Sequence, residues 1–201
     1  MLHNREELQQ TISVPKNETL DYFFIFFAEN ECIERKVVFS LADGAEVHAR
    51  GVIIGSGESE VTLTTEVHHQ GKQTRGYMTI KGVFADRARA HVTGWIKIPE
   101  NGNNADAFLE QRFLLLSKNA RAKAEPMLEI LANDVKASHA ATVSRIDDEQ
   151  LFYLASRGID TVEGRRLLTA AFINEILSTI PSRDVVRSCQ KEITKILNLK
   201  S

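Results

Sequence analysis

Short segments in which hydrophobic and polar residues alternate fill the first two thirds of the chain. In VTLTTEV, Val61 and Leu63 fall on one face of an extended strand and Thr62 and Thr64 on the other, because successive side chains of a strand point to opposite sides. Such segments recur about every 10–14 residues. They are TLDYFFIFFAE, CIERKVVFSL, AEVHARGVIIG, SEVTLTTEVHH, TRGYMTIKGVF, ARAHVTGWIKI and AFLEQRFLLLS. The pattern predicts an all-β array over residues 1–146.

The connections between these segments limit the possible β folds. Turn residues such as ADG, GSGE and PENGNN separate the strands, and no helical pattern intervenes. A doubly wound α/β fold is excluded, because its parallel strands need crossover helices. A sandwich, a barrel and a β-helix all remain compatible with the pattern.

The hydrophobic period changes after Ile146 to that of a helix. Asp147 is a suitable N-cap, with Gln150 at the third position of a capping box, and the pattern predicts a helix over residues 148–157. Gly158 is a natural stop, and Thr161 can cap a second helix.

Two further helices with apolar faces are predicted in a helical domain over residues 147–201. The face of the second helix carries Leu167, Leu168, Ala171, Phe172, Ile176 and Leu177. The face of the third carries Val185, Val186, Cys189, Ile193, Ile196 and Leu197. Helices of this size cannot bury so much apolar surface among themselves, so we expect them to cover the end of the β array, a partner, or both.

The charge and the cysteine content disfavour some classes of function but do not identify one. The formal net charge is −2, which provides no electrostatic basis for binding nucleic acid or an anionic membrane. Cys32 and Cys189 are far apart, with no CxxC pair, and the simplest interpretation is a reducing, cytoplasmic compartment. The polar N-terminus, MLHNREELQQ, lacks the apolar core of a signal peptide.

One histidine stands at the junction of the strand and helix patterns. His139 lies in DVKASHAATVSRIDDEQLFYLASRGI, where an alternating segment precedes the first helix. Neutral imidazole is a competent iron ligand. The structural alternative is a polar hinge whose ring bonds a backbone carbonyl.

Residues 114–172 closely resemble the core of the SufB/SufD family of iron–sulfur cluster assembly scaffolds. The matching elements, in order, are LLLS, Ala120, Pro126 with LEI, SHAATV, LFYL, SRGI and RRLL followed by AF. Residues 66–99 resemble the later β turns of that family more weakly. The resemblance implies a right-handed parallel β-helix followed by a small C-terminal helical domain. Relatives are about twice as long, so a short form with fewer β turns is expected.

The resemblance also implies partners. Family members pair with each other through the β-helix, as a heterodimer or homodimer, and assemble with an ABC-type ATPase through the C-terminal helices. The helix carrying Glu163, Arg165, Arg166 and Phe172 is the candidate ATPase-docking helix, although these charges also suit a solvated face. The chain has no GxxxxGK[ST] motif of its own.

Two positions favour the SufD branch over SufB. The SufB branch carries a cluster-ligating cysteine where this chain has Arg112, which cannot bind a metal. SufB also carries glutamate after the histidine, where this chain has Ala140. The resemblance thus places His139 at a subunit interface as the candidate iron or cluster-site residue. It implies no tightly bound cofactor, only iron or a transient cluster held together with a partner.

Other candidates are weaker. His68 and His69 are adjacent and point to opposite faces of a strand, so they are poorly placed to chelate one ion. His91 could approach one of them from a neighbouring turn, but the favoured interpretation is a surface histidine. Cys32 and Cys189 are interpreted as small buried hydrophobes.

Three hypotheses therefore follow from the sequence. The first is a non-enzymatic SufD-like scaffold that pairs with a SufB-like subunit or itself. The second is a structural homodimeric β-helix module with no metal role. The third, an enzyme with a groove on the β-helix, lacks the clustered acids that such sites need.

Overall fold

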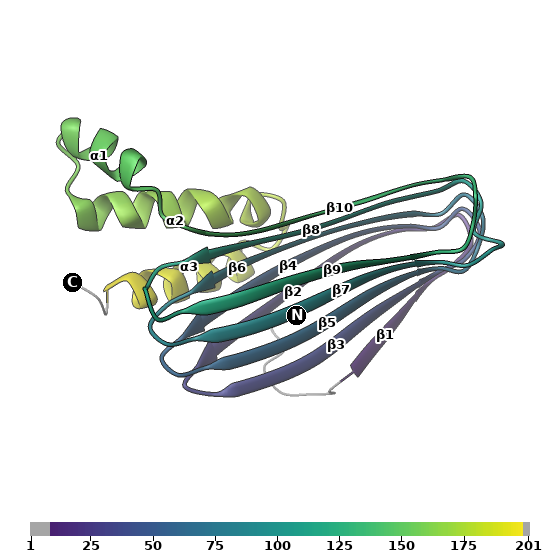
Figure 1. Ribbon diagram of the computed structural model, residues 1–201, viewed down its shortest axis with the longest axis horizontal. Helices are drawn as coiled ribbons and strands as arrows, with labels where there is room; N and C mark the ends of the chain where they lie inside the picture. The colour runs from purple at the N-terminus through teal and green to yellow at the C-terminus, as the bar shows by residue number, and fades with distance from the viewer. Residues whose placement is uncertain (1–8, 199–201) are drawn as a thin grey trace.

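The protein is a β-solenoid with three helices at its C-terminal side (Figure 1). The computed structural model describes residues 9–198. The strands are β1 (Gln9–Val14), β2 (Thr19–Glu29), β3 (Cys32–Leu41), β4 (Glu46–Ser56), β5 (Glu60–His69), β6 (Arg75–Phe84), β7 (Arg89–Ile98), β8 (Ala105–Leu115), β9 (Arg121–Ile130) and β10 (Val135–Arg145). The helices are α1 (Asp148–Ser156), α2 (Thr161–Leu177) and α3 (Arg183–Asn198).

Consecutive strands alternate between two parallel sheets. The odd sheet has the order β1-β3-β5-β7-β9 and the even sheet the order β10-β8-β6-β4-β2. Each strand pairs with the strand two places away in sequence, in parallel register. This is the coil of a parallel β-helix, so the fold implied by the family resemblance is confirmed, and the sandwich and the barrel are excluded.

The turns stack in the same way as the strands. Most of them contain one residue with positive φ, and these residues are Asn17, Asn30, Gly44, Gly57, Gln73, Asp86 and Asn104. Side chains of one turn bond the backbone of the next. The Asn30 carboxamide oxygen accepts from the Glu58 N–H at 3.0 Å, and the Asp86 carboxylate accepts from the Gly57 N–H at 3.0 Å. These turn residues therefore also hold successive coils in register.

The main hydrophobic core fills the space between the two sheets. Phe39, Leu41, Ile53, Leu63 and Ile80 are among its completely buried side chains. The aromatic run YFFIFFA divides between two environments, because strand side chains alternate. Phe24 and Phe26 enter this inner core, whereas Ile25 faces the opposite side.

A second hydrophobic core lies on the outer face of the even sheet, under α2 and α3. Ile25, Val52, Ile54 and Val83 pack there against helix residues that include Ile173 and Ile193. Because α2 and α3 cover this face, β4 is buried on both sides. Its sequence therefore contains a continuous apolar run, Val52 to Ile54, in place of an alternating pattern. None of the described helices is long and apolar enough to cross a membrane.

The position of the helices corrects one expectation. They do not cover the end of the β array; α2 and α3 lie alongside the carboxyl ends of the even-sheet strands (Figure 1). The last turn, formed by β9 and β10, is left exposed along much of its length. We call this uncovered turn, residues 121–145, the open end.

The alternation of hydrophobic and polar residues did not predict two of the strands, β1 and β9. β9 has the sequence RAKAEPMLEI, in which polar residues and Pro126 obscure the alternation. A proline cannot donate a backbone hydrogen bond, and it is tolerated here because β9 is the edge strand of the odd sheet. The sequence features that hid this strand are therefore those of a sheet edge.

The helix termini agree with the sequence, apart from one cap. Asp147 caps α1 by accepting from the Glu149 N–H at 2.9 Å, and Gly158 follows with φ of 82°. The cap of α2 is Asp160, which accepts from the Glu163 N–H at 2.9 Å, so Thr161 is the first helical residue and not the cap. The carboxylate of Asp160 reaches the free N–H groups better than the predicted hydroxyl.

The buried helix faces differ in part from the predicted ones. In α2 the buried residues are Gly164, Thr169, Ile173, Ile176 and Leu177, whereas Leu167 and Ala171 are exposed. In α3, Cys189, Ile193 and Ile196 are buried as predicted, and the side chain of Leu197 lies outside the described residues. Cys189 is a buried thiol, and burial raises its pKa to about 12. Cys32, by contrast, is exposed, because it begins β3 directly after a turn.

Candidate functional site

His139 faces the interior of the solenoid at its open end. In the even sheet it is in register with Leu109, which is in register with Met78, and both of these belong to the inner core. Residues in register on neighbouring strands point to the same side. His139 is nevertheless exposed, since β10 is the last strand and no further turn covers it.

The imidazole of His139 is free to bind a ligand. Within the described residues it makes no hydrogen bond or ion pair, so the backbone-bonded hinge of the structural alternative is not formed there. The described residues also contain no group of three or more metal-binding side chains. His139 can therefore supply one ligand to a metal, and the remaining ligands must come from elsewhere.

The open end exposes hydrophobic side chains as well as unpaired strand edges. Its exposed hydrophobic residues are Met127 (41% exposed), Ile130, Leu131 (59% exposed) and Val143. Small side chains line its inner side, and Ala122, Ala124 and Ala137 are only partly buried against the core. Unpaired strand edges that carry exposed apolar side chains favour pairing with another chain. The sequence analysis missed this surface because it did not recognise β9.

Arg112 lies on the other side of the even sheet from His139. It is in register with Lys81 and with Thr142, and these residues point outward toward α2. Its guanidinium is 3.5 Å from the Glu175 carboxylate and stands over the Phe172 ring. Arg112 is thus a structural partner of α2 and is not adjacent to the His139 imidazole.

A completely buried lysine completes the contact between α2 and the even sheet. The Lys81 ammonium donates to the Phe172 carbonyl at 2.8 Å, pairs with Glu175 and lies 4.7 Å from the centre of the Phe172 ring. The hydrogen bond from Lys81, together with the charges of Lys81 and Arg112, outweighs the effect of burial and lowers the pKa of Glu175. The cluster ties α2 to β6 and β8.

The predicted docking residues on α2 separate into two groups. Phe172 faces the sheet, half-buried beside Lys81 and Arg112. Glu163 and Arg166 form an ion pair of 3.3 Å at the start of the helix, and Arg165 is half-buried nearby. Glu163 and Arg166 also line a groove of about 520 Å³ between α2 and α3. Other residues of this groove are Leu167, Ala171, Asn174 and Gln190.

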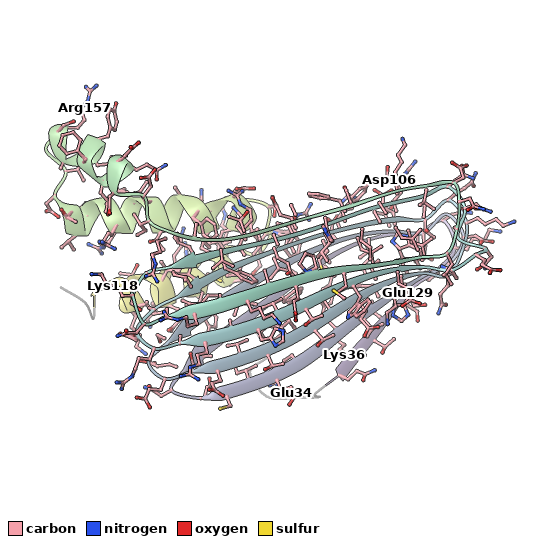
Figure 2. The ribbon with its side chains drawn as sticks, in the orientation of Figure 1. Glu34, Lys36, Asp106, Lys118, Glu129 and Arg157 are labelled. Carbon is pink, nitrogen blue, oxygen red and sulfur yellow. The ribbon has the colours of Figure 1, made fainter. Side chains whose placement is uncertain are left out.

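α1 also exposes aromatic residues. Phe152 is 77% exposed and Tyr153 is 58% exposed, and Val162 and Leu167 on α2 are also exposed. Arg157 stands over the Tyr153 ring and lies at the tip of the helical region (Figure 2). Sequence reasoning had placed the apolar faces of the helices against the β array, so it did not identify these residues as a surface.

The other histidines within residues 9–198 are engaged in structural contacts. His68 contacts Glu66 at 2.6 Å, and His91 pairs with Glu125. His69 is buried and bonded to Thr74 at 2.8 Å, and burial lowers its pKa to about 4. His91 is exposed and does not approach His68 or His69, so the favoured interpretation of it as a surface histidine is confirmed.

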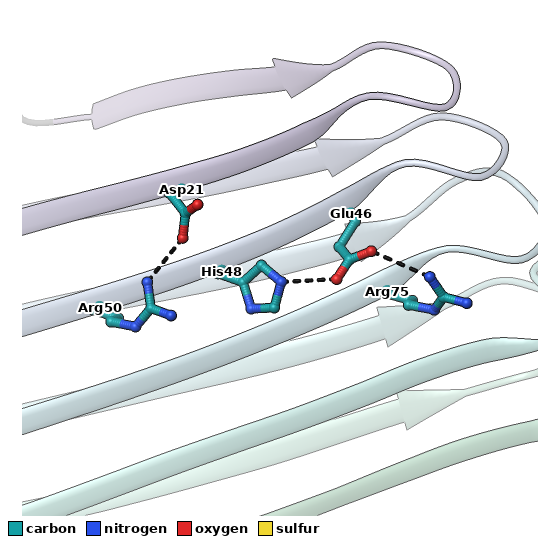
Figure 3. A network of polar contacts seen from close by, with 5 residues as sticks. All are labelled: Asp21, Glu46, His48, Arg50 and Arg75. Carbon is teal, nitrogen blue, oxygen red and sulfur yellow. Dashed lines mark hydrogen bonds and ion pairs between the residues drawn. The ribbon is translucent and has the colours of Figure 1, made fainter. Parts of the chain in front are cut away.

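Outward-facing charges hold neighbouring strands together. On the even sheet Asp21 pairs with Arg50 at 2.9 Å, and Glu46 contacts His48 at 2.7 Å and Arg75 at 3.2 Å (Figure 3). Asp21–Arg50 and Glu46–Arg75 join neighbouring strands, whereas Glu46 and His48 both lie on β4. Cross-strand pairs stabilise one register over its alternatives. These contacts satisfy the residues involved and indicate a structural role.

Comparison with known proteins identifies the family. Residues 9–172 match the SufBD core domain of SUF system iron–sulfur cluster assembly. The chain is 34% identical over 172 residues to the iron–sulfur cluster assembly protein SufD of Bacillus subtilis, which covers 86% of this chain and 38% of the relative. It is 40% identical over 100 residues to SufD of Escherichia coli, covering 50% of this chain and 24% of the relative.

A third relative is an iron–sulfur cluster assembly SufBD family protein of Pyrococcus horikoshii, 32% identical over 159 residues, covering 79% of this chain and 34% of the relative. The chain thus spans less than half the length of these relatives. Together with the parallel β-helix, these matches lead to one conclusion. The chain belongs to the SufB/SufD family of iron–sulfur cluster assembly proteins and is closer to SufD.

Proposed function

We propose that this protein is a non-enzymatic, SufD-like scaffold subunit in iron–sulfur cluster assembly. The observation that carries the proposal is the free imidazole of His139, which faces into the solenoid at an open end with bare strand edges and exposed apolar residues. A subunit that pairs across this end would bring its own ligands next to the imidazole.

The pairing partner in this proposal is a SufB-like subunit or a second copy of the chain. β9 and β10 present unpaired backbone groups, and a strand of the partner can bond to either edge. Leu131 and Met127 would be buried by such pairing. Iron or a nascent cluster is the cargo held in the interface, with thiolate ligands from the partner, since iron–sulfur clusters normally require them.

The second partner in the proposal is an ABC-type ATPase that docks on the C-terminal helices. Leu167, Phe152 and Tyr153 are exposed there, and the Glu163–Arg166 pair borders the groove between α2 and α3. Apolar anchors would supply affinity and the flanking charges would set the orientation of the partner. A reducing, cytoplasmic compartment suits this role, because both cysteines are free thiols.

Anaerobic reconstitution tests the role of His139. The chain is mixed with a SufB-like subunit and the ATPase, and the recovered complex is loaded with ferrous iron and sulfide. We expect co-purification of the subunits and the absorbance of a cluster. His139→Ala should retain the complex and lose most of the cluster.

The control for this experiment is His91→Ala, which removes an exposed histidine remote from the open end. Failure to recover any complex would contradict the proposed pairing. An unchanged cluster yield in His139→Ala would instead favour a structural β-helix module with no metal role.

A further inference from the structure

A buried glutamine lies one turn below His139, inside the solenoid. Gln111 in β8 is in register with Ile80 of the inner core and with Ala141 of the open end, so its side chain points inward. Leu109, two residues before it, is in register with His139. Gln111 and His139 are therefore diagonal neighbours on adjacent strands, which places their Cβ atoms about 7–8 Å apart.

The amide of Gln111 is completely buried and unsatisfied. Neither its oxygen nor its nitrogen has a hydrogen-bond partner within the described part of the chain. A buried amide without partners destabilises a fold by about 1–3 kcal/mol, and more than nine in ten such groups are bonded in native proteins. A leucine or methionine would fill this position without that cost.

The opposite sheet is shaped to admit this amide. Gly94 of β7 faces it, and a Cβ at Gly94 would come within 2.8 Å of the Gln111 amide nitrogen and 2.6 Å of a Leu109 methyl group. Glycine inside a strand is itself unfavourable. Gly94 and Gln111 are thus two residues in contact in the interior, each of which lowers the stability of the fold.

This place lies one strand below the open end, under Ala141 of β10 and Pro126 of β9. The residue above Gln111 is Ala141, an exposed residue whose side chain is a single methyl group, and no further turn follows. A primary amide can both donate and accept hydrogen bonds. It is therefore suited to a water or sulfide ligand of a metal that His139 binds.

We propose that Gln111 is a positioning residue for a transition-metal ion held by His139, and that its amide orients the metal's water or sulfide ligand. This inference rests on the proposed function, because it requires a metal at His139. Residues that bond a metal's ligands from the next layer typically change affinity by about 10–100-fold.

The test uses the full chain and Co²⁺ as the probe, because Co²⁺ binds nitrogen ligands more tightly than Fe²⁺. Paramagnetic broadening of the His139 ring signals by NMR gives a dissociation constant at that residue alone, even if binding is weak. We expect Gln111→Leu to weaken Co²⁺ binding at His139 by at least about tenfold. The same variant should have a higher Tm, since it removes an unsatisfied amide.

The matched control is Thr65→Val. Thr65 is also buried with an unsatisfied hydroxyl, and it lies on the far side of Gly94 from the open end, in register with it. We expect a higher Tm for this variant and unchanged Co²⁺ binding. A raised Tm together with unchanged binding in Gln111→Leu would overturn the inference and leave the proposed function intact. If Co²⁺ does not broaden the His139 signals of the native chain, this inference is wrong, whereas the proposed function, in which a partner supplies the remaining ligands, is decided by the reconstitution experiment.

Discussion

Single residues on the outer face of the odd sheet show how a buried charge is stabilised in this fold. The Glu66 carboxylate is buried, although it lies on an outer face, because long neighbouring side chains cover it. It accepts from Lys36 at 2.7 Å, His68 at 2.6 Å and Lys97 at 3.0 Å. Burial alone would raise the pKa of Glu66, but the hydrogen bonds from Lys36, His68 and Lys97 outweigh it and lower the pKa to about 2.

This cluster leads to a prediction about stability and pH. Glu66→Gln should lower the free energy of unfolding at pH 7 by about 1–3 kcal/mol, because it removes the charge that two lysines share. The depressed pKa means that the stabilisation is present above the unfolded pKa, near 4.5, and is lost as pH falls toward 2. Urea titrations at pH 7 and pH 3 measure both effects.

The control for Glu66 is Glu129→Gln, on the same sheet but exposed (Figure 2). It should change stability by less than about 0.5 kcal/mol. Equal losses in the two variants at pH 7, or a Glu66→Gln effect that is no smaller at pH 3 than at pH 7, would contradict the ionic explanation.

At the level of elements, one charged contact determines how α2 lies on the even sheet. Lys81 is a buried charge on the outer face of β6, and Phe172 and Glu175 of α2 contact its ammonium group. Its carboxylate partner, Glu175, is itself more than half exposed and is shared with Arg112. Lys81 therefore depends on the docking of α2, and hydrophobic contacts elsewhere in the interface supply most of the packing.

A double-mutant cycle should show this dependence. Glu175→Ala is expected to destabilise the chain by about 3 kcal/mol, because it leaves Lys81 buried without its counter-charge. Lys81→Met combined with Glu175→Ala should recover part of that loss, giving a coupling energy of about 1–3 kcal/mol in denaturant titrations.

The exposed Glu163–Arg166 pair on the same helix is the comparison. Replacing Glu163 and Arg166 by alanine, singly and together, should give a coupling energy below about 1 kcal/mol, as for other solvent-exposed pairs. Additive effects at Lys81 and Glu175 would show that the buried ammonium finds a different partner in the folded protein.

For the whole molecule, the main consequence of the architecture is that the solenoid has bare strand edges. Backbone groups along β10 and β9 have no neighbour on one side within the described chain, and apolar residues accompany them. The helices do not protect this end, since they cover the outer face of the even sheet. The bare edges of β9 and β10 and the exposed residues of α1 and α2 are thus distinct surfaces.

Association through the open end should be sensitive to charge there. Leu131→Glu is expected to weaken pairing with a second copy or a SufB-like subunit at least about tenfold, because a carboxylate would have to be buried in the interface. Sedimentation over a range of concentrations measures this. Phe152→Glu, on α1, should leave pairing unchanged and weaken only ATPase binding; a loss of pairing in that variant would contradict the separation of the two surfaces.

Local patterns determined a large part of this protein from sequence alone. The alternation of side chains predicted most strands, turn residues marked their ends, and Asp147 and Gly158 delimited the first helix, because these signals depend on neighbours in sequence. The family resemblance selected the parallel β-helix from among the β folds and singled out His139. Two features that the sequence contains were not predicted. Polar residues and Pro126 hid the alternation of the edge strand β9, and Thr161 was preferred to Asp160 as the cap of α2.

Only the tertiary structure decided which surfaces are covered. Leu167 and Cys32 were expected to be buried and are exposed, whereas Lys81 is buried, because burial depends on which element packs against a face and not on the residue type alone. The inward direction of His139, the unsatisfied amide of Gln111 and the uncovered last turn follow from the register of strands that lie about thirty residues apart in the chain. Periodicity along one segment carries no information on such long-range pairing, which is why the site itself could be recognised only once the coil was assembled.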